Sequence, residues 1–239
     1  MNNKPPQEID SKLIADFVQS QCEQSLCAST VNRRLAAISS FFTFLVDESE
    51  DDNLRNPVIW KRHSIRQGHH LPRDVSDETI HQLMTAIDHS RDRAMFELML
   101  GAGLRVGEVV TLKKDDIHPT DDAGLVRLRV CGKGDKERIA WLTRESYRFL
   151  QQWLQKRPEN DQKTLFLNHR GQPLSVAGVQ YRLKQHCQKT GIKITCHQLR
   201  HTYARRLVEQ GVPIDSLAKL LGHNDLQTTQ RYIDAVSYT

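Results

Sequence analysis

The sequence predicts a mainly α-helical protein with one small antiparallel β-sheet, divided into two domains. Most segments repeat apolar residues every three or four positions, which is the period of a helix with one buried face. One segment, LVRLRVCGKGDKERIAWL, instead alternates apolar and polar residues before a glycine-containing turn, as a β-hairpin does. A polar, basic stretch with Gly68 and Pro72 separates the two helical regions, so we expect a linker there.

The first domain is expected to be helical and to cover residues 1–65. Its apolar residues fall at helical spacing in two stretches, and polar runs interrupt that pattern. The predicted elements are helices over residues 10–20 and 29–47, a solvated acidic loop over 47–52, and a turn or new helix at Asn56-Pro57. We interpret the basic stretch KRHSIRQGHHLPR, residues 61–73, as an interdomain linker and set the domain boundary at 66–74.

The second domain, residues 75–239, is expected to combine further helices with the small sheet. Its helices begin at polar capping residues such as Ser76 and end at glycines such as Gly211 and Gly222. The predicted elements, in chain order, are a helix after Ser76, a buried helix in RAMFELMLG, a short helix after Arg105, the hairpin, a third strand at residues 164–167, and helices over Ser175–Lys189, His197–Gln210 and Pro213–Leu221.

The composition argues against several classes of protein. No apolar run is long enough to span a membrane, so we expect no membrane partner. The N-terminal stretch MNNKPPQEID has no signal-peptide core, which predicts a cytoplasmic protein. The five cysteines form no CxxC pair, and this favours reduced thiols over a disulfide framework or a metal site.

The charge distribution suggests that the second domain has an anionic partner. The whole chain carries a net charge of +5 and has a pI of about 9.0. Residues 1–65 hold 7 of the 34 Lys and Arg and 9 of the 29 Asp and Glu, so their net charge is −2. The remaining residues therefore carry +7, and the basic excess lies in the second domain.

The stretch CHQLRHTYARRL, residues 196–207, concentrates two histidines and three arginines on one predicted helix. Residues at i, i+3 and i+4 share a helix face, so His197, Arg200 and His201 point together. A zinc site is one alternative, but Gln198 stands where a glutamate base would follow the first histidine, and Arg200 would repel a cation. A solvated basic face is another alternative, and this stretch alone leaves it open.

Four residues outside that helix favour a chemical role. Arg105 follows a glycine break at a predicted helix N-terminus, where its side chain and backbone N–H groups can face an anion. Lys133 lies at the tip of the hairpin, His223 lies just past a helix end, and Tyr232 follows nine residues later. In this set, arginines can clamp a phosphodiester, a tyrosine can attack it, and a lysine and a histidine can move protons. The pattern therefore favours phosphoryl transfer without a metal.

Four boxes occur in order along the second domain, namely GLRVGE, GKGDKER, HQLRHTYA and LLGHNDLQTTQRY. In these boxes the sequence resembles the tyrosine recombinase family, which includes phage integrases, Xer-type recombinases and transposon resolvases. The resemblance covers residues 75–235 closely and residues 10–60 more loosely. It implies an N-terminal helical DNA-binding domain, the SAM-like core-binding domain, followed by an α/β catalytic domain of the tyrosine recombinase type.

The resemblance implies a site-specific DNA recombinase that needs no metal, ATP or other cofactor. Tyr232 would be the nucleophile and would form a 3′-phosphotyrosine. Lys133 would act as general acid on the 5′-oxygen, and His197 would assist proton transfer at the tyrosine. Arg105 and Arg200 would hold the scissile phosphate, so the reaction would depend on charge stabilisation rather than on a bound cation.

Two further residues of the boxes receive supporting roles from the resemblance. His223 would support the phosphate, and Glu108, three residues after Arg105, resembles the family's acidic support residue. His201 is instead expected to pack or to hydrogen-bond. Tyr238 stands outside the TTQRY context, so we do not expect it to be the nucleophile.

The implied partner is a double-stranded DNA recombination site that the two domains clamp. Paired sites in a tetramer would pass through a Holliday junction, and an accessory protein is a further candidate partner. The expected DNA contacts outside the catalytic set are the basic residues Arg33, Arg34, Lys61, Arg62, Lys136 and Arg138. The short first domain and the seven residues after Tyr232 lead us to expect a missing first helix and an altered tetramer contact.

Two other functions stay open from the sequence. A type IB topoisomerase uses the same residue types, but its family usually has lysine three positions before the second arginine, where this chain has His197. An inactive DNA-binding relative is the other alternative, although all the catalytic positions are filled here. A topoisomerase would relax supercoils as a monomer, and an inactive relative would bind DNA without forming a covalent adduct.

Overall fold

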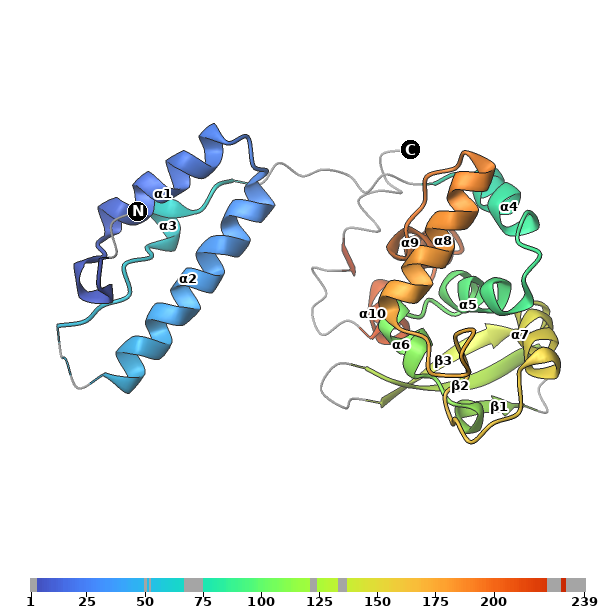
Figure 1. Cartoon of the computed structure of the whole chain (residues 1–239). Helices are drawn as coiled ribbons and strands as arrows, with labels where there is room; N and C mark the ends of the chain where they lie inside the picture. Colours follow the sequence, from blue (N-terminus) through green and yellow to red (C-terminus); the bar gives the residue numbers. More distant parts are fainter. Residues whose placement is uncertain are drawn as a thin grey trace. The chain divides into compact units, whose positions relative to one another are not determined.

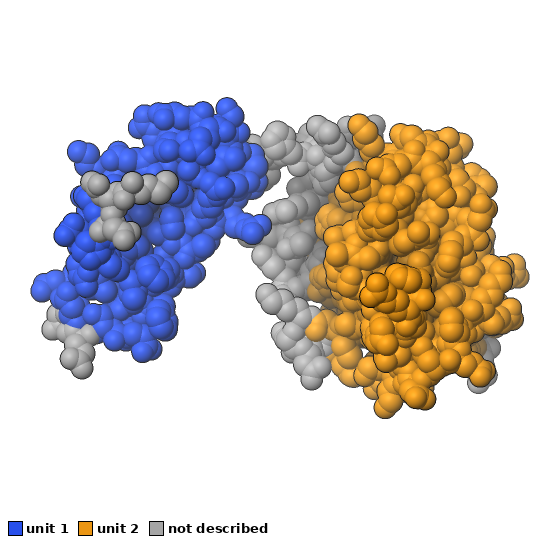
Figure 2. Space-filling view, in the orientation of Figure 1, with its two compact units in different colours: residues 1–70 blue, residues 71–239 orange. Residues whose placement is uncertain are grey.

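The computed structural model divides the chain into two compact units, residues 1–70 and residues 71–239 (Figure 2). The residues whose structure is described are 4–49, 51, 53–66, 75–120, 124–132, 137–222 and 229–230. Among these residues, no helix combines the length and the apolar character that crossing a bilayer requires.

The first unit is a helical hairpin closed by a third, short helix (Figure 1). Its helices are α1 (Ser11–Glu23), α2 (Ala28–Glu48) and α3 (Trp60–His63), preceded by the 3-10 turn η1 (Pro6–Glu8). Asp10 caps α1 because its side chain accepts a hydrogen bond from the Leu13 amide at 2.8 Å. Ile14, Leu35 and Val58 form the buried centre. The two long helices predicted from apolar spacing are confirmed.

Residues 61–73 were interpreted as a linker, but the start of this basic stretch belongs to the first unit, where it forms part of helix α3. His63 of α3 is 3% exposed, and its Nδ1 accepts a hydrogen bond from the Ile59 amide at 3.0 Å. Asn32 of α2 exchanges two hydrogen bonds with the backbone of Ile65, at 2.8 and 2.9 Å. A single helical turn has no apolar repeat, so periodicity could not reveal it.

The second unit is built around helix α5. Its helices are α4 (Asp77–Thr85), α5 (Ser90–Gly101), α6 (Val106–Thr111), α7 (Arg144–Lys156), α8 (Val176–Thr190), α9 (Cys196–Glu209) and α10 (Ile214–Leu221), with a 3-10 turn η2 (Lys114–Asp116). Every residue from 94 to 100 is buried, since α5 packs against α7, α8 and α9 (Figure 1). A helix that is buried all round lies at the centre of a fold.

A three-stranded antiparallel sheet, in the order β1-β2-β3, completes this unit. Its strands are β1 (Ile117–Pro119), β2 (Leu125–Cys131) and β3 (Glu137–Thr143). Leu128 of β2 lies opposite Ala140 of β3, and both are buried. The predicted hairpin is therefore confirmed, with its alternate residues facing the core.

Three elements of this unit differ from the prediction. Residues 164–167 make only isolated bridges outside the sheet, so the predicted third strand was wrong, and β1 pairs with β2 instead. Helix α7 was not predicted at all. Thr143 is both the last residue of β3 and the cap of α7, accepting a hydrogen bond from the Ser146 amide at 3.3 Å. No glycine or proline marks this boundary, which explains the omission.

The remaining predicted helices are confirmed, and their capping residues fix where they begin and end. Ser76, Ser175 and Thr195 cap α4, α8 and α9 through side-chain hydrogen bonds to backbone amides. Gln198 completes a capping box with Thr195. Gly222 ends α10 in the left-handed conformation, with φ of 63°.

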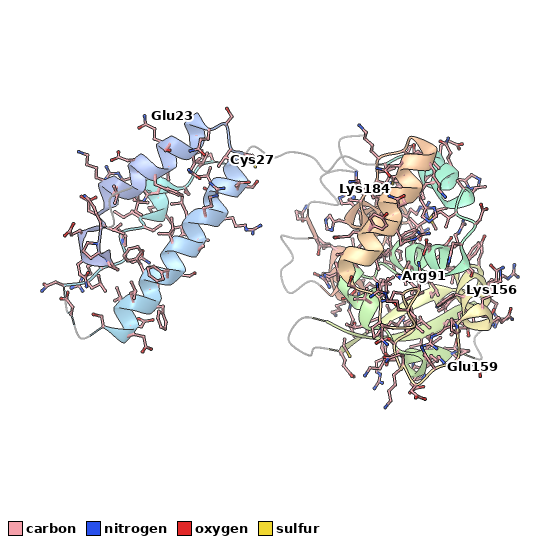
Figure 3. The ribbon with its side chains drawn as sticks, viewed as in Figure 1. Glu23, Cys27, Arg91, Lys156, Glu159 and Lys184 are labelled. Carbon is pink, nitrogen blue, oxygen red and sulfur yellow. The ribbon has the colours of Figure 1, made fainter. Side chains whose placement is uncertain are left out.

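A buried carboxylate ties α5 to α8. Asp92 is fully buried and accepts hydrogen bonds from Arg91, which Figure 3 labels, and from Arg182 Nε at 2.7 Å. His186 Nε2 lies 3.0 Å from the same carboxylate. Burial opposes ionisation of Asp92, but the bonds to His186 and Arg182 outweigh it and lower the pKa of this carboxyl. The two helices are thus held by a charged and fully bonded group.

Candidate active site

The chain turns between α5 and α6 at a position that only glycine can occupy. Gly103 has φ of 63°, and a Cβ built on it would lie 2.4 Å from the ring of Tyr203 on α9. Burial raises the pKa of Tyr203, whose ring covers this turn. The close approach leaves the Gly103 carbonyl facing α9, where it accepts a hydrogen bond from Arg200 Nη1.

Arg105 and Glu108 are joined by two hydrogen bonds at the start of α6. Arg105 is the N-cap, and its amide donates to Glu108 Oε2 at 2.7 Å, while its Nη1 donates to Oε1 at 3.1 Å. The Glu108 side chain is 4% exposed, whereas the Arg105 side chain is 43% exposed. The Glu108 carboxylate therefore accepts the hydrogen bond of the Arg105 backbone N–H, which was expected to face a bound anion. The Arg105 side chain is the group that faces outward.

Two further arginines converge on the Glu108 carboxylate. Arg138 of β3 donates from Nη2 to Oε2 at 2.8 Å, and Arg200 Nη1 of α9 lies 3.8 Å from the same oxygen. Arg200 is 2% exposed. Three guanidinium groups share one carboxylate here, so this cluster keeps an excess of positive charge that an anion can neutralise.

The same three arginines hold the C-terminal end of α10. Each of them donates one hydrogen bond to a successive carbonyl: Arg138 to Leu220 at 3.0 Å, Arg200 to Leu221 at 2.6 Å and Arg105 to Gly222 at 3.1 Å. The last carbonyls of a helix lack partners within it and carry partial negative charge, so cations stabilise them. The cluster and the end of α10 are one connected structure.

His197 lies one turn before Arg200 on α9, and both line a cavity of about 1050 Å³ together with Arg105. Lys184 of α8, labelled in Figure 3, lines the same cavity. Partial burial and the charges of Arg200 and Arg105 lower the pKa of His197. A histidine with a lowered pKa is neutral near pH 7, so it can accept a proton. His201 is 8% exposed, as expected for a packing residue.

Comparison with known proteins identifies the family. Residues 73–237 match the model of the phage integrase family. The chain belongs to this family. Residues 2–49 match its N-terminal SAM-like domain. The chain is 33% identical over 240 residues to tyrosine recombinase XerD of Listeria monocytogenes, covering 95% of this chain and 78% of the relative. It is 34% identical over 207 residues to XerA of Thermococcus kodakarensis, covering 85% and 70%.

Solved structures share the fold of this phage integrase family member. A post-cleavage complex of the XerH site-specific recombinase has a TM-score of 0.81 at 22% identity, covering 95% of this chain and 69% of that one. A crystal structure of XerA recombinase has a TM-score of 0.62 at 25% identity, covering 99% and 83%. The predicted fold class, a helical domain followed by a tyrosine recombinase catalytic domain, is confirmed.

The structure brings together the three predicted catalytic residues that it describes, Arg105, His197 and Arg200. Arg105 and Arg200 meet at the Glu108 carboxylate, and His197 lines the same cavity as the two arginines. Residues predicted for the site that lie outside the described residues are Lys133, Lys136, His223 and Tyr232. Their roles stay predictions.

The basic residues of the first unit lie on its surface. Arg33, Lys61 and Arg62 are exposed, and Arg62 Nη1 lies 3.5 Å from Ser11 Oγ. Arg34 is also exposed but donates a hydrogen bond to Gln21. Their exposure is compatible with phosphate contacts, which stay predictions.

Arg138, predicted as a candidate DNA contact, is bonded within the protein. Its side chain is 12% exposed, and its two terminal nitrogens are bonded to Glu108 and to the Leu220 carbonyl. The sequence held a signal for this position, because Arg138 shares the strand face of Ala140 and Leu142, which are buried. A charged residue in an inward register needs a buried partner, but the sequence does not show which one.

Proposed function

We propose that this chain is a site-specific DNA recombinase that cleaves and reseals strands through a 3′-phosphotyrosine on Tyr232. The observation that carries the proposal is the meeting of Arg105 and Arg200 at Glu108, beside His197. Two guanidinium groups suit the two non-bridging oxygens of a phosphodiester, and a neutral histidine suits proton acceptance. The relatives named tyrosine recombinases support the same reading.

In the proposed reaction the Tyr232 hydroxyl attacks the phosphorus, so a Tyr O–P bond forms and the P–O5′ bond breaks. His197 accepts the tyrosine proton, and Lys133 gives a proton to the departing 5′-oxygen. Arg105 and Arg200 offset the charge that develops on the non-bridging oxygens. A 5′-hydroxyl of another strand then attacks the phosphotyrosine in the reverse sense, which conserves the bond and requires neither ATP nor metal.

The proposed partner is double-stranded DNA carrying a recombination site. Solved relatives are described as complexes with such DNA, namely XerH with difH and a lambda integrase dimer with a core site. We assign residues 1–65 to core binding, 66–74 to the linker and 75–239 to catalysis. A tetramer on paired sites would exchange the strands in the cytoplasm, with an accessory protein as a further partner.

A covalent-trapping experiment tests the proposal. Nicked duplexes from the DNA flanking the protein's own coding region are incubated with the protein in EDTA, and adducts are resolved on a denaturing gel. Wild type and the matched control Tyr238→Phe should form an adduct, and Tyr232→Phe should form none. An adduct that persists in Tyr232→Phe would reject Tyr232, and tight DNA binding without any adduct would favour an inactive relative. Relaxation of plasmids without paired sites would favour a topoisomerase.

Replacing Lys133 with alanine should slow cleavage by about 10²- to 10⁴-fold, the usual contribution of a general acid, while duplex affinity changes little. A substrate with sulfur in place of the 5′-bridging oxygen should restore the rate, because a thiol is far more acidic than an alcohol and leaves without a donated proton. Single-turnover adduct formation measures both rates. Lys136→Ala is the matched control and should keep the wild-type rate at saturating DNA. A large loss of affinity in Lys133→Ala, or no sulfur rescue, would contradict the role.

A further inference from the structure

Arg138 lies on the buried face of the sheet. Arg138 is paired in register with Val130, which is 1% exposed, and its own side chain is 12% exposed. Burial lowers the pKa of Arg138 and the neighbouring Arg105 adds to this, while Glu108 opposes it. A guanidinium is costly to remove from water unless its partners hold it well.

Three elements hold Arg138 in place. Its Nη2 donates to Glu108 Oε2 of α6 at 2.8 Å, and its Nη1 donates to the Leu220 carbonyl of α10 at 3.0 Å. Its Cδ and Nε lie against Gly222, where a Cβ would come within 2.7 and 2.8 Å of them. Within the part of the chain that the structure describes, Nε has no hydrogen-bond partner, so the other contacts determine its position.

The contacts of Arg138 lie next in the sequence to two residues predicted for the site. Lys133 precedes Arg138 by five residues, and His223 directly follows Gly222. Arg138 therefore fixes the start of the strand that follows Lys133 and the helix end that precedes His223. Both are tied to the carboxylate that also holds Arg105.

We propose that Arg138 is a positioning residue for strand cleavage, which holds β3 and the C-terminal end of α10, the elements next to Lys133 and His223 in the chain, in place beside the phosphate-binding arginines. It acts through Glu108 and the C-terminal end of α10 and does not touch DNA. This inference rests on the proposed function. Catalysis is sensitive to displacements of about 1 Å, so loosening this link should slow the chemical step more than it weakens binding.

A second buried arginine offers a matched comparison. Arg157 is 6% exposed and donates to backbone carbonyls of the segment after α7, including Gln162 at 2.7 Å and Thr164 at 2.8 Å. It contacts none of the site residues in these bonds. A variant of Arg157 should therefore lower stability without changing the rate of the folded protein. Arg129 on β2, bonded to Asp116 at 2.9 Å, controls for changes in the sheet.

The experiment compares Arg138→Met, Arg138→Lys, Arg157→Met and Arg129→Met in the full chain. Thermal unfolding gives the folded fraction, titration with duplex gives the Kd, and single-turnover adduct formation at saturating DNA gives the cleavage rate. We expect Arg138→Met to cleave roughly 10- to 100-fold more slowly per folded molecule, with the Kd within about threefold of wild type. Arg138→Lys, which keeps the charge and one bond, should be intermediate, and the two control variants should keep the wild-type rate.

A double variant tests whether Arg138 and Glu108 affect the cleavage rate through the same contact or independently of each other. If part of the effect of Arg138 passes through this carboxylate, Glu108→Gln/Arg138→Met should lose less rate than the product of the two single losses. Multiplicative losses would overturn the proposal, as would an equal slowing in Arg157→Met or a large rise in Kd alone. If Arg138→Met does not fold, the Arg138→Lys rate decides. A wild type that forms no adduct would reject the proposed function and this role with it, whereas a fully active Arg138→Lys and Arg138→Met would reject only the role of Arg138.

Discussion

Replacing Arg200 with alanine should lower the rate of strand cleavage by at least about 10²- to 10³-fold, the loss seen when one charge-stabilising donor is removed. Arg200 supplies positive charge beside Arg105 and also bonds the Gly103 and Leu221 carbonyls. The variant therefore loses charge stabilisation and the anchor of two chain segments at once. Single-turnover adduct formation at saturating DNA measures the effect.

Two other variants make this result interpretable. Arg206→Ala removes an arginine of the same helix whose side chain is 37% exposed and pairs with Asp77, so its cleavage rate should be unchanged. Arg200→Lys keeps the charge but loses the forked geometry that lets one guanidinium bond two carbonyls, so it should recover only part of the rate. A near-normal rate in Arg200→Ala would reject Arg200 as a phosphate-binding residue.

Replacing Glu108 with alanine should lower the free energy of unfolding by about 3–5 kcal/mol, the usual loss when one partner of a buried ion pair is removed. Arg138 and Arg200 would keep their charges in a buried cluster without a counterion. The amide of Arg105 would also lose its acceptor at the start of α6. Urea unfolding followed by circular dichroism measures the change.

Asp116 provides the comparison for Glu108. It is 5% exposed and bonds Arg129, but the Arg129 side chain is 45% exposed, so water can solvate the charge when the carboxylate is removed. Asp116→Ala should therefore destabilise the protein clearly less than Glu108→Ala. Equal losses in the two variants would contradict the view that Glu108 compensates several buried guanidinium groups.

Much of the fold was predictable because its elements carry local signals. The helices with apolar stripes and capping residues, from α1 to α10, follow from spacing and from residues such as Asp10 and Gly222. The three-residue strand β1 and the single-turn helix α3 did not, because they are too short to show a period. Helix α7 has both an apolar stripe and the cap Thr143, but it was missed because Thr143 joins it to β3 without a breaker.

In the site, too, contacts between neighbours in the sequence were predictable, whereas contacts made by tertiary packing were not. Arg105 and Glu108 are three residues apart at a helix start, so their pairing is a local property that the sequence can indicate. The contacts of Arg138 and Arg200 to the end of α10 depend on how β3, α9 and α10 pack together. No periodicity encodes such a meeting, so the sequence could indicate Arg138 only as a candidate DNA contact.

The bonds at the end of α10 have a consequence for the dynamics of the site. An eight-residue helix is too short to persist alone in water, so α10 is ordered by its packing and by the three arginines at its last carbonyls. Helix and cluster should therefore open and close as one cooperative unit. Hydrogen exchange at the amides of α10, measured without DNA, would then report the fraction of molecules in which the three arginines are bonded to the end of this helix.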